Sequence, residues 1–365
     1  MKSLYFPPEI RYGNTFSKYA NSFRSIGMLI DRNPEKMTTY YNLPAITFLL
    51  SDRDSTTLDR TRYLEALSYG DPGVLLASPG PSLSGLMMRE LGLPEQIETF
   101  YTTLFHQKMK TFFALTEPEK GSDANHLEAR LTAVSSKKDM YFLNGKKCFF
   151  GNGVTGETGI TLARTAQGPA GIRVVWLTPD ILNQNTIEKK LLPMWSLRGA
   201  QIALMAFQNT AIPSECILGQ HKSACENGLL SVVKVFNKLR TGVGALALGL
   251  AQAVLDICSY EYSKQMLLKN SEWQLLQEKL NNVRILLHNA AKKVDENALE
   301  SRAPSLAKAL ATQTAEKVVS HCVHNCSYDF LIQNEWLLKA YRDVFCFEFM
   351  EGTTHIHKKI IMRGL

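Results

Sequence analysis

The chain has 365 residues, of which 45% are hydrophobic and 21% are charged, a balance that excludes a disordered protein. This length exceeds what one simple core holds, so the sequence predicts two or three packed domains. The net charge of +7 comes from basic residues interspersed with acidic ones, which argues against a nucleic-acid groove and suits an acidic or phosphate-bearing partner.

Cysteine usage and the apolar runs bear on the compartment. The seven cysteines are an odd number scattered along the chain, which indicates free thiols in a reducing environment. No stretch approaches the roughly 18 apolar residues of a membrane span, and the first residues lack a signal-peptide pattern. We therefore expect a cytoplasmic protein that does not cross a membrane.

Three regions of different periodicity follow one another, and together they predict an α+β multidomain protein. Residues 1–112 form the first, an N-terminal α-helical domain. It contains a helix over 58–67 that stops at Gly70, a second over 83–91, and a third that begins at Pro94.

Residues 113–220 predict a central antiparallel β-sandwich or small barrel. Short β-rich runs recur about every ten residues, at 131–134, 141–143, 147–150, 160–163, 172–177 and 202–207. Asn144-Gly145 between two of these runs is the strongest short signal for a β-hairpin. A loop over 192–199 carries two large apolar residues, and it suits closing over a ligand and capping the core equally well.

Residues 221–365 return to helical periodicity and predict a C-terminal four-helix bundle. One long helix spans about 229–266 and contains Gly242, Gly244 and Gly249. Because glycine costs about 1 kcal/mol at each interior helix position, these three indicate close approach of a neighbouring segment. Further helices are expected at about 272–300, 304–326 and 334–348, with a short one after Thr353.

An ordered turn is expected where the helical region gives way to the β region. Pro118 fixes its own φ and keeps Glu117 out of helical geometry, while Gly121 permits close backbone approach. Ser122 and Asp123 add short hydrogen-bonding side chains. On composition alone, the turn is as consistent with an ordinary strand-to-loop junction as with a grip on a polar ligand.

The order of these elements and several local patterns resemble the acyl-CoA dehydrogenase family of flavoproteins. The patterns are Leu115-Thr116-Glu117-Pro118 with Gly121-Ser122-Asp123, Tyr141 to Lys147, Asn152-Gly153, Leu197-Arg198-Gly199, Phe236 to Arg240, Gly249-Leu250-Ala251, Arg342-Asp343 and Phe349 to Thr353. They run from about residue 90 to the C-terminus, and the residues before that match only in helical character. Their order and separations carry the resemblance more than any single motif does.

The resemblance implies FAD bound between the β domain and the helical bundle, with a substrate thioester stacked on the flavin. By position, the cofactor residues are Phe113, Leu115, Thr116, Gly121, Ser122, Phe149, Phe150, Gly151, Thr353 and His355. The substrate residues are Ser122, Asn237, Lys238, Arg240 and Gly352. For His355, a solvated helix face is an equally consistent interpretation.

Glu351 occupies the position of the usual catalytic base of the family. A thioester α-proton is weakly acidic, so its removal needs a carboxylate aimed at Cα while flavin accepts a hydride from Cβ. The apolar neighbours Phe349 and Met350 predict burial, which would raise the pKa of Glu351 towards the working pH. Some members carry the base just before the equivalent of Arg240, but Leu239 stands there in this chain. The alternative interpretation is an acid that stabilises a helix N-terminus.

Two family patterns are missing, both on the distal side of the implied FAD site. The Arg-x-x-Phe-Gly pattern, which reaches the FAD pyrophosphate of a neighbouring subunit, falls on 265–269, where no arginine or glycine is present. The Gly-Gly-x-Gly turn falls near 326–330, where bulky residues replace the glycines. A threonine-like position in the flavin wall has also become Gly151. Three interpretations stay open: FAD held by weak or altered contacts, a different quaternary structure, or loss of flavin.

The leading hypothesis is an FAD-dependent dehydrogenase of an acyl or aminoacyl thioester, carried on CoA or on an acyl carrier protein, in a biosynthetic role. An electron-accepting flavoprotein or oxygen would take the electrons, and a homodimer or homotetramer is expected. The alternatives are a degenerate, flavin-poor subunit that stabilises an active partner, and a flavin oxidase or monooxygenase on the same fold. No metal is expected, because the histidines and cysteines over 321–326 crowd one helix without paired zinc spacing.

Overall fold

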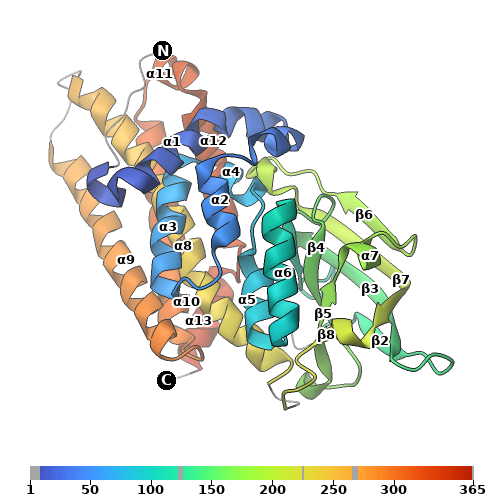
Figure 1. Cartoon of the computed structure of the whole chain (residues 1–365). Coiled ribbons are helices and arrows are strands. Elements are labelled where there is room, and N and C mark those ends of the chain that lie inside the picture. The colour runs from blue at the N-terminus through green and yellow to red at the C-terminus, as the bar shows by residue number, and fades with distance from the viewer. Residues whose placement is uncertain (1–8, 122–125, 224–225, 265–269, 364–365) are drawn as a thin grey trace.

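The computed structural model describes residues 9–121, 126–223, 226–264 and 270–363. A body of helices and a β domain built on one sheet lie side by side (Figure 1). Helices from the beginning and the end of the chain make up the body, and the strands come from the middle of the sequence. The predicted order of helices, then strands, then helices is confirmed.

The N-terminal helices are α1 (Glu9–Arg32), α2 (Pro44–Ser51), α3 (Thr57–Gly70), α4 (Pro72–Ala77), α5 (Ser82–Leu91) and α6 (Pro94–Gln107), with a 3-10 helix at Pro34–Tyr40. The three helices with predicted positions, α3, α5 and α6, lie close to those positions, and three further helices precede or separate them. Thr56 caps α3 by accepting a hydrogen bond from the Asp59 amide, and Asp71 caps α4 by accepting one from the Val74 amide. These caps satisfy amides that a helix N-terminus otherwise leaves unpaired.

The central strands form a single mixed sheet. They are β1 (Thr111–Ala114), β2 (Arg130–Ala133), β3 (Met140–Phe150), β4 (Thr158–Arg164), β5 (Ile172–Leu177), β6 (Ile187–Leu191), β7 (Ala203–Pro213) and β8 (Ile217–Leu218), with the short helix α7 (Pro179–Leu182) between β5 and β6. The strand order is β6-β7-β3-β2-β4-β5-β8, and β1 pairs with β4 beside this path. Most pairs are antiparallel as predicted, but β1 and β2 both run parallel to β4, so the sheet is not wholly antiparallel.

The predicted β-hairpin at Asn144-Gly145 is wrong. Both residues lie inside β3, which continues through them without a turn. The pairing of β3 with β7 shifts register between Leu143 and Gly145, and Gly145 has a φ of +141°. A Cβ added at Gly145 would lie 2.7 Å from the Cα of Ala129. Gly145 therefore allows a β-bulge in β3 and the close approach of the segment before β2.

The C-terminal part of the body is a bundle around the long helix α8 (Leu229–Lys264). The other helices are α9 (Asn270–Glu296), α10 (Arg302–His324), α11 (Tyr328–Gln333), α12 (Glu335–Asp343) and α13 (Thr354–Met362), with a 3-10 helix at Val344–Glu348. A Cβ added at Gly249 of α8 would lie 2.2 Å from the Glu65 carbonyl oxygen of α3. This confirms the close approach that the glycines of this helix predict.

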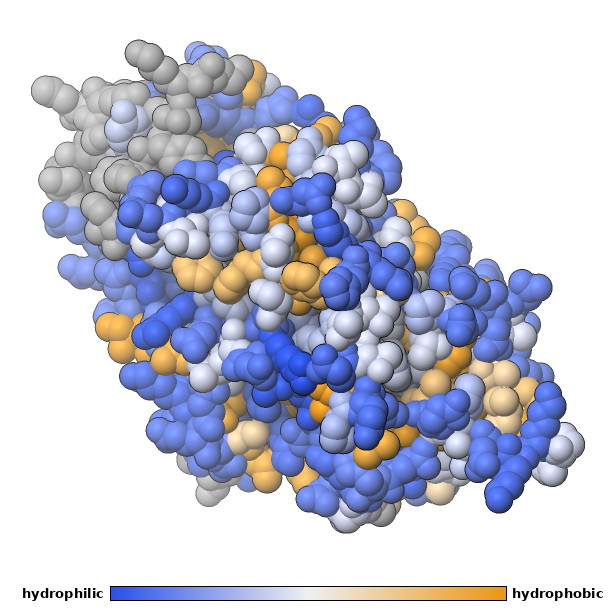
Figure 2. All heavy atoms as spheres, viewed as in Figure 1, coloured by the Kyte–Doolittle hydropathy of each residue, from blue (hydrophilic) through white to orange (hydrophobic). Residues whose placement is uncertain are grey.

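Helix α8 also corrects the prediction about long apolar runs. By length and composition alone it could cross a membrane, but 94% of its most apolar window is buried inside the protein. It is therefore the central core helix of the bundle. The molecular face shown in Figure 2 is mostly polar, with hydrophobic residues in small groups.

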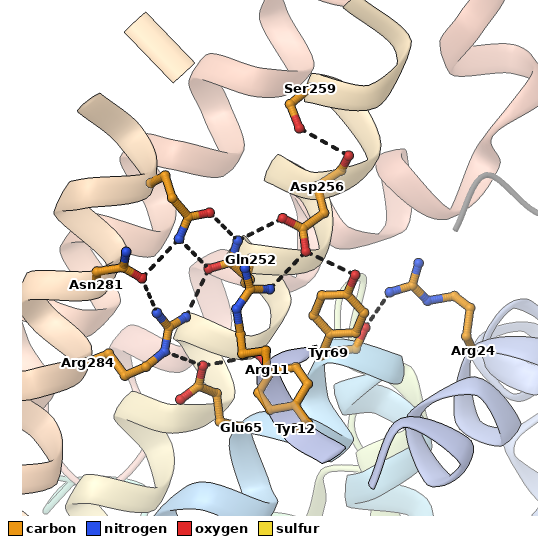
Figure 3. A network of polar contacts seen from close by, with 11 residues as sticks. Arg11, Tyr12, Arg24, Glu65, Tyr69, Gln252, Asp256, Ser259, Asn281 and Arg284 are labelled. Carbon is orange, nitrogen blue, oxygen red and sulfur yellow. Dashed lines mark hydrogen bonds and ion pairs between the residues drawn. The ribbon is translucent and has the colours of Figure 1, made fainter. Parts of the chain in front are cut away.

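A buried polar network joins the N-terminal helices to the bundle (Figure 3). Glu65 of α3 accepts a hydrogen bond from Arg284 of α9 at 2.7 Å. Asp256 of α8 accepts one from Arg11 of α1 at 2.9 Å and one from Tyr69 of α3 at 3.0 Å. Because loss of either partner would leave a charge or polar group buried and unpaired, these contacts fix how the four helices pack. The N-terminal helices thus share one core with the bundle, while the domain boundaries after residues 112 and 220 stay predictions.

Candidate active site

The turn after β1 is fixed by a buried ion pair. The Glu117 carboxylate accepts a hydrogen bond from the Lys147 ammonium at 2.7 Å and hydrogen bonds from two backbone amides, and both charged side chains are buried. Lys147 also donates to the Leu115 carbonyl at 3.1 Å, and the Thr116 carbonyl accepts from the Cys148 amide at 2.9 Å. These contacts hold the backbone of Leu115 and Thr116 against β3. The turn therefore presents Thr116 from a fixed position.

Phe149 and Phe150 face opposite sides at the end of β3. Phe149 has a φ of +58°, and 65% of it is exposed. Phe150 is buried against Phe112, with ring centroids 5.5 Å apart. Phe149 is thus available to a flat ring. Strand alternation turns the Phe150 side chain into the β core, and its predicted cofactor contact stays a prediction. In Gly151, the next residue, an added Cβ would lie 3.2 Å from the Ala200 carbonyl oxygen.

Strand β1 meets helix α8 through Phe113 and Phe236, whose ring centroids lie 5.8 Å apart. About one helical turn further along α8, Arg240 donates a hydrogen bond to the Asn237 side-chain oxygen at 2.7 Å. Asn237 donates in turn to the Ala298 carbonyl at 3.0 Å and is fully buried. Both ends of the Asn237 amide therefore make hydrogen bonds inside the protein, and through one of them Asn237 orients Arg240. The predicted substrate contact of Asn237 stays a prediction.

Glu351 lies in the loop between the 3-10 helix Val344–Glu348 and α13, with a φ of +53°. Its Oε2 atom is buried and makes no hydrogen bond to any residue that the structure describes. Burial raises the pKa of Glu351 to about 7, against the opposing effect of the Arg240 and Lys308 charges. A carboxyl with this pKa is present in both protonation states at neutral pH, which suits a general base.

The residues after Glu351 begin helix α13 and separate the two interpretations of this acid. Thr353 caps the helix by accepting a hydrogen bond from the Ile356 amide. The Glu348 carboxylate accepts from the Thr354 amide at 2.7 Å. The unpaired amides at this helix end are thus served by other groups, and Glu351 is not needed as a helix N-terminal acid.

The remaining predicted site residues differ in how far they are exposed to solvent. His355 is exposed, as the solvated-helix interpretation expects, and Gly121 is exposed at the turn. Lys238 is half-buried, and burial lowers its pKa. Gly352 has a φ of +101° and packs against His357. Ser122 lies outside the described residues.

The loop before β7 is tied to the segment that leads to Glu351. The Leu197 amide donates a hydrogen bond to the Asp343 carboxylate at 2.7 Å. The Asp31 carboxylate of α1 accepts from both Arg198 and Arg342, the latter at 2.7 Å. Two motifs that lie far apart in the sequence therefore meet in space, and they place the β-domain loop beside the bundle.

The distal side differs from the family pattern, as the sequence predicts. Helix α10 ends at His324, and Ser327 caps α11 by accepting a hydrogen bond from the Phe330 amide. A helical turn thus stands where the Gly-Gly-x-Gly turn is expected, and residues 265–269 lie outside the described residues. Within the described ranges, no group of three or more His, Cys, Asp or Glu side chains could hold a metal ion.

Two family models match the sequence. Residues 112–210 match the acyl-CoA dehydrogenase middle domain, and residues 226–365 match the acyl-CoA dehydrogenase C-terminal domain. The chain belongs to the acyl-CoA dehydrogenase family. The matched segments contain Thr116, Phe149, Arg240 and Glu351, so the candidate site comes from both domains of this family fold.

Relatives of this acyl-CoA dehydrogenase family member include dehydrogenases and reductases. The 3-(aryl)acrylate reductase of Clostridium sporogenes is 28% identical over 81% of this chain and 79% of the relative. The caffeyl-CoA reductase-Etf complex subunit CarC of Acetobacterium woodii is 27% identical over 80% of this chain and 77% of the relative. Butyryl-CoA dehydrogenase from Megasphaera elsdenii is similar in structure, with a TM-score of 0.79, 25% identity and 96% of both chains covered. The prolyl acyl carrier protein oxidase AnaB shares the fold, with a TM-score of 0.77, 20% identity and 99% of both chains covered.

The family consists of FAD flavoproteins, as in the solved FAD complex of PigA. The ring-side residues of this chain fit that cofactor on three observations. Phe149 presents an exposed aromatic face, the Thr116 turn is held rigidly, and Glu351 and Arg240 carry buried polar atoms without hydrogen bonds to described residues. Buried polar atoms of this kind normally have partners, so a bound ligand is the natural source of theirs.

Proposed function

We propose that the chain is an FAD-dependent dehydrogenase of an acyl or aminoacyl thioester, with Glu351 as the base that removes the α-proton. The observation that carries this proposal is the state of Glu351, whose carboxyl is buried, has an unpaired Oε2 atom and has a pKa raised to about 7. When ionised, the carboxylate takes the proton from Cα of the thioester. FAD, when bound, supplies the acceptor for the hydride that leaves Cβ.

The neighbouring residues support this chemistry in different ways. Arg240 and Lys308 place positive charge near the carboxylate and favour its ionised form. Asn237 fixes the direction of Arg240 through the 2.7 Å hydrogen bond. Thr116 and Phe149 would hold the flavin ring, and Gly352 leaves room beside the base. Lys238 and Ser122 stay proposed contacts for the distal part of the substrate.

The charge of the chain and the names of its relatives bear on the carrier, the partners and the setting of the reaction. The net charge of +7 suits CoA phosphates and also suits the acidic surface of a carrier protein. The relative AnaB is named as a prolyl acyl carrier protein oxidase, and the relative CarC is named as a subunit of a caffeyl-CoA reductase-Etf complex. We therefore include both carriers, an electron-accepting flavoprotein or oxygen as acceptor, a homodimer or homotetramer, and a cytoplasmic biosynthetic role.

A second candidate is the same site working in the opposite direction, as a reductase of α,β-unsaturated thioesters. Its support is that the relatives with 27–28% identity include enzymes named as reductases of acrylate-type and caffeyl substrates. Protonated Glu351 would then return a proton to Cα. A carboxyl whose pKa is about 7 holds that proton on a large share of molecules at neutral pH.

The test is thioester-dependent bleaching of the flavin absorbance in purified holoprotein. We expect a visible flavin spectrum in the wild type, and loss of bleaching by at least about a hundredfold in Glu351→Gln, as for removal of a general base. Met362→Leu, which changes an exposed side chain on α13 outside the predicted site, is the control and should bleach normally. Undiminished bleaching in Glu351→Gln would refute the base. A colourless protein that stays unbleached with added FAD favours the partner-subunit alternative, and oxygen consumption without another acceptor favours the oxidase.

A further inference from the structure

Lys308 of α10 grips the backbone on both sides of Glu351. Its ammonium group donates one hydrogen bond to the Glu348 carbonyl at 2.9 Å and another to the Gly352 carbonyl at 2.8 Å. The two carbonyls bracket the loop in which Glu351 adopts its left-handed backbone conformation, with a φ of +53°. A non-glycine residue in that region is strained and needs surrounding contacts to hold it. Lys308 supplies such contacts from a different helix.

Burying the charged side chain of Lys308 costs folding free energy, which argues against a purely structural role. The residue has no exposed surface, and its two hydrogen bonds within the described residues both go to neutral carbonyls. Burying an ammonium group without a carboxylate in hydrogen-bond contact is strongly unfavourable. The Glu348 carboxylate accepts hydrogen bonds from the Thr354 amide and hydroxyl, and among the described residues it forms no ion pair with Lys308. The position therefore retains a positive charge beside Glu351 at a cost in stability.

We propose that Lys308 is a positioning residue for the base: it holds the Glu351 loop through the Glu348 and Gly352 carbonyls and sets the charge next to the carboxylate. This inference rests on the proposed function of Glu351. Lys308 touches neither substrate nor flavin in this role. It acts through the direction in which Glu351 points and through the pH at which that residue becomes a carboxylate.

The protonation of Glu351 depends on charged and titratable groups from each helix that packs around its loop. Arg240 of α8 and Lys308 of α10 favour the carboxylate form of Glu351. His357 of α13 is fully buried beside Gly352, and burial lowers its pKa to about 3, so it stays neutral. Burial also lowers the pKa of Lys308 to about 8, while Glu348, Glu351 and Glu316 raise it and Arg240 lowers it. Near neutral pH, Lys308 and Arg240 thus supply the positive charge around Glu351.

The test compares Lys308→Met, Lys308→Arg and Thr312→Val by the pH profile of single-turnover flavin bleaching. Thr312 lies one turn from Lys308 on α10, is fully buried and bonds the Lys308 carbonyl, so its variant perturbs the same helix without removing the charge. We expect the acid limb of the Lys308→Met profile to move up by about one pH unit, which lowers the rate about tenfold below the limb. Lys308→Arg and Thr312→Val should keep the wild-type limb. An unmoved limb in Lys308→Met would overturn the proposal, since a merely structural residue lowers the folded fraction without shifting it.

A second readout needs neither flavin nor activity. In the flavin-free protein, the difference in stability between Glu351 and Glu351→Gln versus pH reports the pKa of Glu351. We expect the midpoint of that difference to rise in the Lys308→Met background, and an unchanged midpoint counts against the proposal. Bleaching that survives in Glu351→Gln would remove the proposed base itself. If Glu351→Gln abolishes bleaching while Lys308→Met behaves as the wild type in both readouts, the role of Lys308 alone is refuted.

Discussion

Replacing Glu351 with glutamine should make the stability of the flavin-free protein less dependent on pH. Burial in the folded protein raises the pKa of this carboxyl from 4.5 to about 7. Between these values the folded protein keeps a proton that the unfolded chain has lost, so the stability of the wild type falls as the pH rises. At about 1.4 kcal/mol for each pKa unit, the loss approaches about 3 kcal/mol above pH 7. The Glu351→Gln variant has no proton to lose and escapes this fall.

Urea unfolding of both proteins between pH 5 and 8 measures the effect. We expect the variant to gain about 2 to 3 kcal/mol over the wild type across this range, with most of the change below pH 7. The exposed Met362→Leu, which carries no titratable group, serves as the control, and its difference from the wild type should not vary with pH. A constant difference between Glu351→Gln and the wild type would refute the raised pKa, and with it the burial argument for the base.

Three further substitutions test the surroundings of the site. Lys147→Met leaves the Glu117 carboxylate buried without its ion-pair partner and should cost about 3 to 5 kcal/mol of unfolding free energy, part of which a second change to Glu117→Gln should restore. Gly249→Ala places a Cβ 2.2 Å from a backbone carbonyl of α3 and should destabilise the protein by about 1 to 3 kcal/mol in urea unfolding, and an unchanged midpoint would contradict the close packing. His357→Gln should make the protein more stable to acid, because burial lowers the pKa of this imidazole to about 3. The wild type should therefore lose about 2 kcal/mol of unfolding free energy between pH 7 and 5, and the variant should not. Thermal melts at both pH values measure the difference.

The sequence predicts the helices and most strands because their signals are local. Pro94 predicts the start of α6 because proline suits the first turn of a helix, and the glycines of α8 indicate the close packing found at Gly249. The Asn144-Gly145 prediction is wrong because the same dipeptide that favours a tight turn also fits a β-bulge. The choice between a turn and a bulge depends on Ala129, which precedes the neighbouring strand β2, and no local sequence pattern encodes that contact.

The candidate site also combines residues that the sequence identifies with residues that only the structure identifies. Glu351, Arg240 and Thr116 are found from motif resemblance, yet nothing in the sequence identifies Lys308 or the Glu117–Lys147 pair as their supports. Each support joins residues more than 25 positions apart, and its meaning depends on burial that only the packed structure provides. The hydrogen bonds of Asn237 belong to the same class. The resemblance assigns Asn237 to the substrate by position, and only the packed structure shows that its side chain bonds Arg240 and the Ala298 carbonyl.

The state of Glu351 also bears on the direction of the reaction. A carboxyl with a pKa of about 7 is as able to return a proton to Cα as to remove one at neutral pH, so the base itself favours neither direction. The reduction potentials of the thioester and of the electron partner must decide it. Glu351→Gln should therefore slow both bleaching by a saturated thioester and reoxidation of the reduced flavin by a 2-enoyl thioester, by similar factors, because the forward and reverse reactions share one transition state. Stopped-flow absorbance with both thioesters measures the two losses. A loss in one direction only would show that a second group carries the proton.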